Sequence, residues 1–240
     1  MQERNPAGKA PLPLLYNGLV ETAARVHLVL YAFYGKALSF EELRLLDFFA
    51  VFPGDLGAPI NVHPPLQGRA GAYSIRPEAI RRSLGLLEGL GFVEAGPEAR
   101  GPCCLNGNGA SVEAYLRHSY WKAVHASAQW LRETMDGQGR ESFFARLAGR
   151  LADLAAGPSG GPDGQTERFA GLAECYRSDL QRSLAIEEAA WMYGLFARNG
   201  KPASGSVPGE DWFLGVQRAA EAEHARVASL SAGLESLMAR

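Results

Sequence analysis

Apolar residues recur three or four positions apart in segment after segment of this chain, and glycine or proline separates one segment from the next. Such spacing places the apolar side chains on one face of a helix, where they can be buried together. The first segment, residues 18–34, carries Val20, Ala24, Leu28, Tyr31 and Tyr34. The pattern predicts a mainly α-helical protein whose core is built from amphipathic helices.

Two further helices are predicted from start and stop signals. Ser39 stands three residues before Glu42, the spacing of a capping box, and Pro53 with Gly54 ends the helix that this box opens. Pro77 suits the first turn of a third helix, because its missing N–H costs nothing there, and Gly91 closes that helix. Between them, residues 53–73 are rich in proline and glycine, which predicts a long loop.

A small β-hairpin is expected directly after the third helix. The short apolar runs 92–94 and 103–105 flank a turn that contains glycine and proline. Helix, helix, helix, hairpin is the order of a winged helix, although the long loop before the third helix is unusual for that fold. We therefore expect a winged-helix-like N-terminal domain with a small hairpin wing.

The remainder of the chain reads as helical. We expect a long helix at residues 111–135 and a shorter one after it, then a Gly/Pro/Ser-rich linker at 157–164. This divides the chain into a winged-helix-like domain with bracing helices, 14–156, and a helical extension, 165–240. The last helix, from about Asp211, has a coiled-coil-like apolar seam that packs either on the preceding helix of the same chain or on another subunit.

Composition narrows the environment in which the protein works. The chain has 240 residues, of which 47% are apolar, and a formal net charge of -2, so no long-range field draws it to nucleic acid or to an anionic membrane. Its three cysteines include the adjacent pair Cys103 and Cys104, which does not suit a disulfide framework. With no signal-peptide pattern and no apolar run near the ~20 residues of a membrane span, we expect a cytoplasmic protein.

No pattern in the sequence indicates catalysis. Neither a phosphate-binding GxxxxGK[ST] loop nor a GxGxxG turn after a strand is present, and no GxSxG or SxxK motif marks a nucleophile. His118 and His125 share a helix face, but two helical turns separate them by about 10 Å, too far to chelate one ion. We expect no enzyme activity, no cofactor and no metal.

Arginines near the third helix raise the question of DNA binding. A winged helix reads the major groove with its third helix, whose outward positions here include Arg81, Arg82 and Glu88. The acidic neighbour and the lack of Asn or Gln argue against base readout. Four arginines are either exposed to solvent without a partner role or make nonspecific contact with the DNA backbone: Arg76, Arg81, Arg82 and Arg100.

A series of short motifs over residues 14–135 resembles a known family. The motifs are Leu15-Tyr16-Asn17, the LLDFF run at 45–49, the GDLGAP loop at 54–59, the HPP run at 63–65, the EGLGFVE passage at 88–94 and the YLRHSYWKAVHASAQWL helix at 115–131. In this order they resemble the middle component of bacterial ABC-three-component systems, the group that includes the small accessory subunit of Lamassu-type anti-phage systems.

The resemblance implies a function without chemistry of its own. It implies an adaptor subunit that bridges an SMC/Rad50-like coiled-coil ATPase and an effector such as a nuclease. Polar residues of the loop and of the helix before it are the candidates for the partner interface: Asp47, Asp55, His63 and Arg69. Alternatively, these residues pair with backbone amides of the loop and help to hold its shape. A winged-helix transcription regulator is the alternative function, and an enzyme with a non-obvious site is a third.

Overall fold

The computed structural model describes residues 18–59, 61–63, 69–95, 102–156 and 165–198, together with Ala225, Ser229 and Ala232. In this part the chain forms seven α-helices, two 3-10 helices and one two-stranded sheet. The elements are α1 Leu19–Ala32, α2 Phe40–Val51, η1 Pro53–Leu56, α3 Arg69–Gly89, β1 Val93–Ala95, β2 Cys103–Leu105, α4 Gly107–Val112, η2 Glu113–Tyr115, α5 Ser119–Gln138, α6 Arg140–Ala156 and α7 Gln165–Arg198. The predicted fold class, mainly α with a small hairpin, is confirmed.

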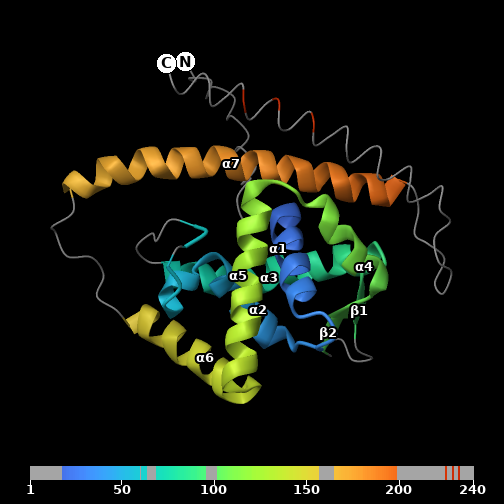
Figure 1. Cartoon of the computed structure of the whole chain (residues 1–240), viewed down its shortest axis with the longest axis horizontal. Helices are drawn as coiled ribbons and strands as arrows, with labels where there is room; N and C mark the ends of the chain where they lie inside the picture. Colours follow the sequence, from blue (N-terminus) through green and yellow to red (C-terminus); the bar gives the residue numbers. More distant parts are fainter. Residues whose placement is uncertain are drawn as a thin grey trace, which may run out of the picture.

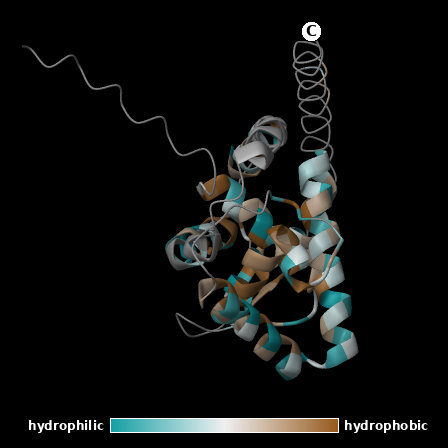
Figure 2. Cartoon of the chain, turned by 90° about the vertical axis from the view of Figure 1, so that its left-hand side faces the viewer, coloured by the Kyte–Doolittle hydropathy of each residue, from teal (hydrophilic) through white to brown (hydrophobic). Residues whose placement is uncertain are grey.

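Helix α1 lies at the centre, and the other helices surround it (Figure 1). Every residue from Glu21 to Leu30 is buried, polar ones included. Helices α2, α3, α5 and α7 all pack on α1, and α6 packs against α2, α3 and α5. Apolar segments face inward and hydrophilic ones outward (Figure 2). The polar side chains of a helix enclosed in this way need polar partners inside the protein. The polar residues of α1 and their partners therefore define a candidate site.

Helix α2 starts where the capping box predicts. The Ser39 hydroxyl accepts the Glu42 N–H at 3.3 Å, and the Glu42 carboxylate accepts the Ser39 N–H at 2.7 Å. The hairpin is also as predicted, with Val93 opposite Leu105 and Ala95 opposite Cys103 in an antiparallel pair. The chain order α1, α2, α3, β1, β2 is the one expected of a winged helix, and the assignment to that fold stays a prediction.

Helix α3 begins earlier than predicted. Pro77 lies inside it, not in its first turn, and the helix starts at Arg69. Proline removes the N–H that would bond one turn back and its ring crowds the carbonyl there, so a helix continues through it only where neighbouring elements hold it. Arg76 supplies that hold, since its side chain is bound to Asp47 of α2. The predicted loop 53–73 is therefore shorter, and η1 occupies its start.

The predicted long helix at 111–135 is wrong at its start. The chain forms α4 and η2 first, and α5 begins only at Ser119. Asn106 caps α4 by accepting the Gly109 N–H at 3.0 Å. A side chain at Gly109 would clash with the Phe92 carbonyl oxygen, which a Cβ would approach to 2.5 Å. The break leaves the backbone N–H groups before α5 open to a partner from elsewhere in the chain.

Helix α7 crosses over α1 and α5 and is the longest helix described (Figure 1). Its second half joins the same apolar core as the N-terminal helices, through Ala185, Ala189, Met192, Tyr193 and Phe196. Residues on both sides of the predicted boundary at 157–164 thus share one core. The linkers 157–164 and 200–209, the seam of the last helix and Arg100 lie outside the described residues.

Candidate functional site

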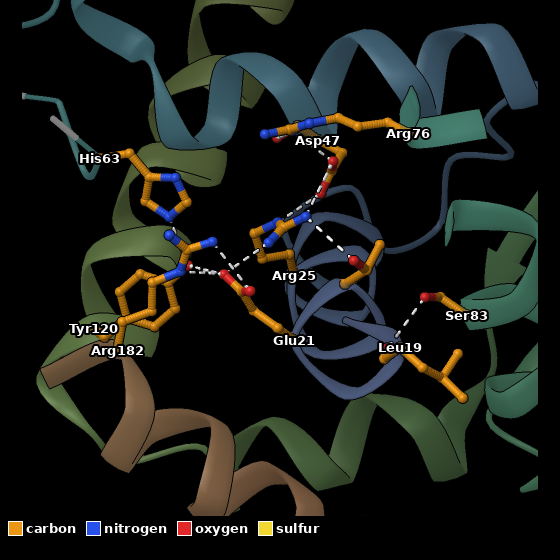
Figure 3. Close-up of polar contacts among 10 residues, drawn as sticks. Leu19, Glu21, Arg25, Asp47, His63, Arg76, Ser83, Tyr120 and Arg182 are labelled. Atoms are coloured by element: carbon orange, nitrogen blue, oxygen red, sulfur yellow. Dashed lines mark hydrogen bonds and ion pairs between the residues drawn. The ribbon is translucent and has the colours of Figure 1, made fainter. Parts of the chain in front are cut away.

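Buried charged residues from four helices meet beside α1 (Figure 3). Glu21 and Arg25, one turn apart on α1, lie at the centre, and both side chains are fully buried. Asp47 of α2, Arg76 of α3 and Arg182 of α7 complete the set of charges, and Tyr120 of α5 and His63 extend it. We call these seven residues the charged cluster. It contains three guanidinium groups and two carboxylates.

Asp47 holds two of the arginines. The Arg25 Nε donates to Asp47 Oδ1 at 2.8 Å, and an Arg76 Nη donates to Asp47 Oδ2 at 2.7 Å and to the Asp47 carbonyl oxygen at 3.0 Å. Burial by itself raises the pKa of Asp47, but the charges of Arg25 and Arg76 outweigh it and lower that pKa below its ordinary value. Asp47 is therefore an anion that ties α1, α2 and α3 together.

Glu21 holds the other side of the charged cluster. Arg182 donates to its two carboxylate oxygens at 2.6 and 3.1 Å, and an Arg25 Nη lies 2.9 Å from Oε1. The Tyr120 hydroxyl donates to the same oxygen at 3.0 Å. Glu21 therefore joins α1 to α5 and α7. The Arg25 guanidinium lies between the two carboxylates and contacts both Glu21 and Asp47.

His63 ends this chain of contacts as a neutral ring. Its Nε2 lies 2.8 Å from the Tyr120 hydroxyl oxygen. Because the Tyr120 proton goes to Glu21, the hydroxyl must accept from His63, which places the imidazole proton on Nε2. Burial, followed by the charges of Arg182, Arg25 and Arg76, lowers the pKa of His63 well below its ordinary value. The loop after η1 is thus linked to α7 through Tyr120 and Glu21.

The structure changes the interpretation of three predicted site residues. Asp47, His63 and Arg76 are buried, with exposed fractions of 0%, 6% and 3%. We expected them at a partner or DNA surface. In this structure their polar atoms are turned into the charged cluster, and their part in a partner or DNA contact stays a prediction. Only tertiary packing reveals this inward orientation, since each is a common surface residue type.

The other predicted residues lie apart from the charged cluster. Asp55 is half-buried in η1, and Arg81 and Arg82 are exposed on α3, where both pair with Glu78 at 3.7 and 3.0 Å. Arg69 is the first residue of α3, and its side chain is not among those described. The candidate interface and DNA residues therefore do not form one surface with Asp47 and Arg76.

Sequence reasoning missed Glu21, Arg25, Tyr120 and Arg182. A signal for the first two exists: they stand four residues apart in a helix that is otherwise almost wholly apolar. Opposite charges at this spacing are adjacent on a helix, and in a buried helix they mark a polar site. Nothing in the sequence indicated that Arg182, more than 150 positions further on, would join them.

A second polar group lies on the other side of α1. The His27 Nε2 contacts the Gly109 carbonyl oxygen at 2.8 Å, and Nδ1 contacts the Tyr193 hydroxyl at 3.1 Å. A carbonyl only accepts, so Nε2 carries the proton and Nδ1 accepts from Tyr193. Burial lowers the pKa of His27 to about 4. We call His27, Gly109 and Tyr193 the neutral cluster.

In the described part of the chain, no three His, Cys, Asp or Glu residues are grouped so as to hold a metal ion. None of its helices has an apolar stretch that would reach across a bilayer.

Comparison with known proteins places the chain in a family. Residues 15–154, more than half of the chain, match the model of the ABC-three component (ABC-3C) system Middle Component 2. No curated protein and no solved structure matches it. The predicted resemblance to a middle component of such systems is thus confirmed. The chain belongs to the Middle Component 2 family of ABC-three component systems.

Proposed function

We propose that this chain is a non-catalytic adaptor of a Lamassu-type anti-phage complex in the cytoplasm, where it bridges an SMC/Rad50-like ATPase and an effector such as a nuclease. The observation that carries the proposal is membership of the Middle Component 2 family. A middle component of a multi-component system works with protein partners, and the identity of those partners follows from the resemblance described above.

The buried polar residues support a structural role over a catalytic one. Catalytic acids and bases lie in clefts that a substrate can reach. Here Glu21, Arg25 and Asp47 are fully buried and bound to one another. With their other partners in the charged cluster, these residues hold five helices in one arrangement, which is what a subunit needs in order to present fixed surfaces to two partners.

The loop at η1 is the surface best suited to a partner. The Asn61 side chain accepts the Gly54 N–H at 2.8 Å, and Gly57 ends η1 with a positive φ of 99°. From α6, Arg146 and Arg150 donate to the carbonyl oxygens of Leu56 and Asp55, both at 2.8 Å. A surface loop held in this way loses little conformational entropy on binding.

Co-expression with the neighbouring ATPase and effector genes tests the proposal. We expect the three proteins to elute together in size-exclusion chromatography. Asp55→Lys on the rigid loop should weaken the complex, and Asp153→Lys, an exposed aspartate on α6, is the matched control. Separate elution of the unmodified protein at micromolar concentration, with its circular dichroism intact, would contradict the adaptor role.

A transcription regulator is the second candidate, favoured by the helix and hairpin order and by the exposed Arg81 and Arg82 of α3. Both arginines already pair with Glu78, and Arg81 stacks over the Phe40 ring at 4.9 Å. Binding to DNA from its own promoter distinguishes the two functions. Retention that Arg81→Glu with Arg82→Glu abolishes would favour the regulator.

A further inference from the structure

The second half of α7 packs on the N-terminal helices along an apolar seam. Phe196 fits between the Phe92 ring, with centroids 5.1 Å apart, and the Tyr115 ring at 6.1 Å. Met192 and Ala189 are buried beside it. Phe92 and Tyr115 belong to the part of the chain that matches the family, whereas α7 lies beyond residue 154. The family domain therefore offers an apolar face that it does not itself cover.

Polar groups on the same face select a helix of a particular pattern. Glu21 receives Arg182, and the His27 ring receives the Tyr193 hydroxyl. The Glu188 carboxylate accepts the backbone N–H groups of Arg117 and His118 at 3.2 and 3.0 Å, just before α5. A carboxylate is well placed there, because the start of a helix carries partial positive charge and open N–H donors.

The register of α7 is fixed by these contacts. Glu188 lies six positions after Arg182 and Tyr193 five positions after Glu188, so all three reach their partners only at one axial position of the helix. The Trp121 Nε1 also donates to the Ala185 carbonyl oxygen at 2.9 Å, beside the same seam. A shift of α7 by one turn would take one partner from each of the buried Glu21 and His27 side chains and the acceptor from the part-buried N–H groups before α5, which is costly.

We propose that this face of α1, η2 and α5 is a recognition site for a single amphipathic helix, and that residues 182–196 of this chain are its ligand, selected by Arg182, Glu188 and Tyr193. The site binds the helix noncovalently and in one register. The proposal concerns the family domain and α7 alone, so it does not depend on the adaptor role.

Cutting the connection between the two parts tests this in the full-length protein. A protease recognition sequence placed within residues 157–164 allows the purified chain to be cleaved after it has folded. We expect the C-terminal fragment to remain bound in size-exclusion chromatography, and a labelled peptide of residues 178–198, added in excess, to replace it. Separate elution of the fragment from a folded body would overturn the proposal. So would a bound fragment that never exchanges with the peptide, since α7 would then be an inseparable part of the core.

Substitutions in the peptide leave the fold of the receiving body untouched. Glu188→Ala removes the acceptor for two part-buried N–H groups and should weaken peptide binding about tenfold. Glu187→Ala, the exposed neighbour on the same helix, is the control and should bind as the unmodified peptide does. Equal loss with both peptides, or loss with neither, would show that the polar pattern does not select the helix.

Discussion

Helix α1 carries two buried polar groups that solve the same problem differently. The charged cluster pairs its two carboxylates with arginines, as Asp47 shows with Arg25 and Arg76. The neutral cluster keeps His27 uncharged and gives each ring nitrogen one hydrogen-bond partner. The charged cluster depends on ion pairs within the core, whereas the neutral cluster depends on the His27 ring staying unprotonated.

The two clusters also differ in what they connect. The charged cluster joins α1 to α2, α3, α5 and α7 (Figure 3). The neutral cluster joins α1 to α4 and α7. Loss of one charged residue should therefore disturb more of the molecule than loss of a neutral one. The following four changes test this ranking.

Asp47→Ala should have the largest effect. It leaves Arg25 and Arg76 buried without their shared carboxylate, and removing one partner of a buried ion pair costs about 3–5 kcal/mol. Urea unfolding followed by circular dichroism measures the free energy of unfolding. Glu78→Ala, which removes a surface partner of Arg82, is the control and should change that energy little. Equal effects would mean that the charged cluster is not more important than a surface pair.

Acid should weaken the protein through the neutral cluster. The pKa of His27 is about 4 in the folded state against an ordinary 6.5, so its contribution to stability is present above pH 6.5 and is lost as the pH falls toward 4. Full loss amounts to about 3 kcal/mol. The free energy of unfolding of the unmodified protein and of His27→Gln, measured from pH 7 to pH 4, should show a shallower pH dependence in the variant.

The pH dependence has to be compared between the unmodified protein and His27→Gln because the pKa of Glu188 is also shifted. Burial raises its pKa to about 7 despite the N–H groups of His118 and Arg117, so its contribution is present below about pH 4.5 and is lost as the pH rises through 7. This slope has the opposite sign to that of His27 and is the same in both proteins. Identical pH dependence in the unmodified protein and in His27→Gln would refute the neutral state assigned to His27.

Tyr120→Phe comes next. The change removes one donor from the buried Glu21 carboxylate and the acceptor for the His63 Nε2–H, and a hydrogen bond to a charged group contributes about 2 kcal/mol. Thermal unfolding should show the loss. If His63 is linked to α7 through Tyr120, backbone amide exchange should also quicken in the second half of α7; unchanged exchange there would break that link.

Tyr193→Phe should have the smallest effect of the four. It removes only the donor to the His27 Nδ1, a bond between neutral groups, at about 1 kcal/mol. Because both tyrosine changes remove a single buried hydroxyl, chemical denaturation of the two variants side by side compares the clusters directly. A larger loss for Tyr193→Phe than for Tyr120→Phe would reverse the ranking.

Local patterns predicted most of the secondary structure. The capping box of Ser39 and Glu42 and the hairpin around residues 92–105 are both found. The errors fall where tertiary contacts override local signals. Pro77 lies within a helix whose Arg76 is bound to Asp47, and the N–H groups just before the late start of α5 are received by Glu188 of a distant helix.

The helical class, the positions of most helices and the family could be predicted before the fold was known, because they depend on spacing and on short motifs in fixed order. Helix packing is what turns Asp47, His63 and Arg76 inward and brings Glu21 to Arg182. A charged side chain reads as a surface residue until its partner is known. That partner comes from another helix, and its place is set by how the helices pack.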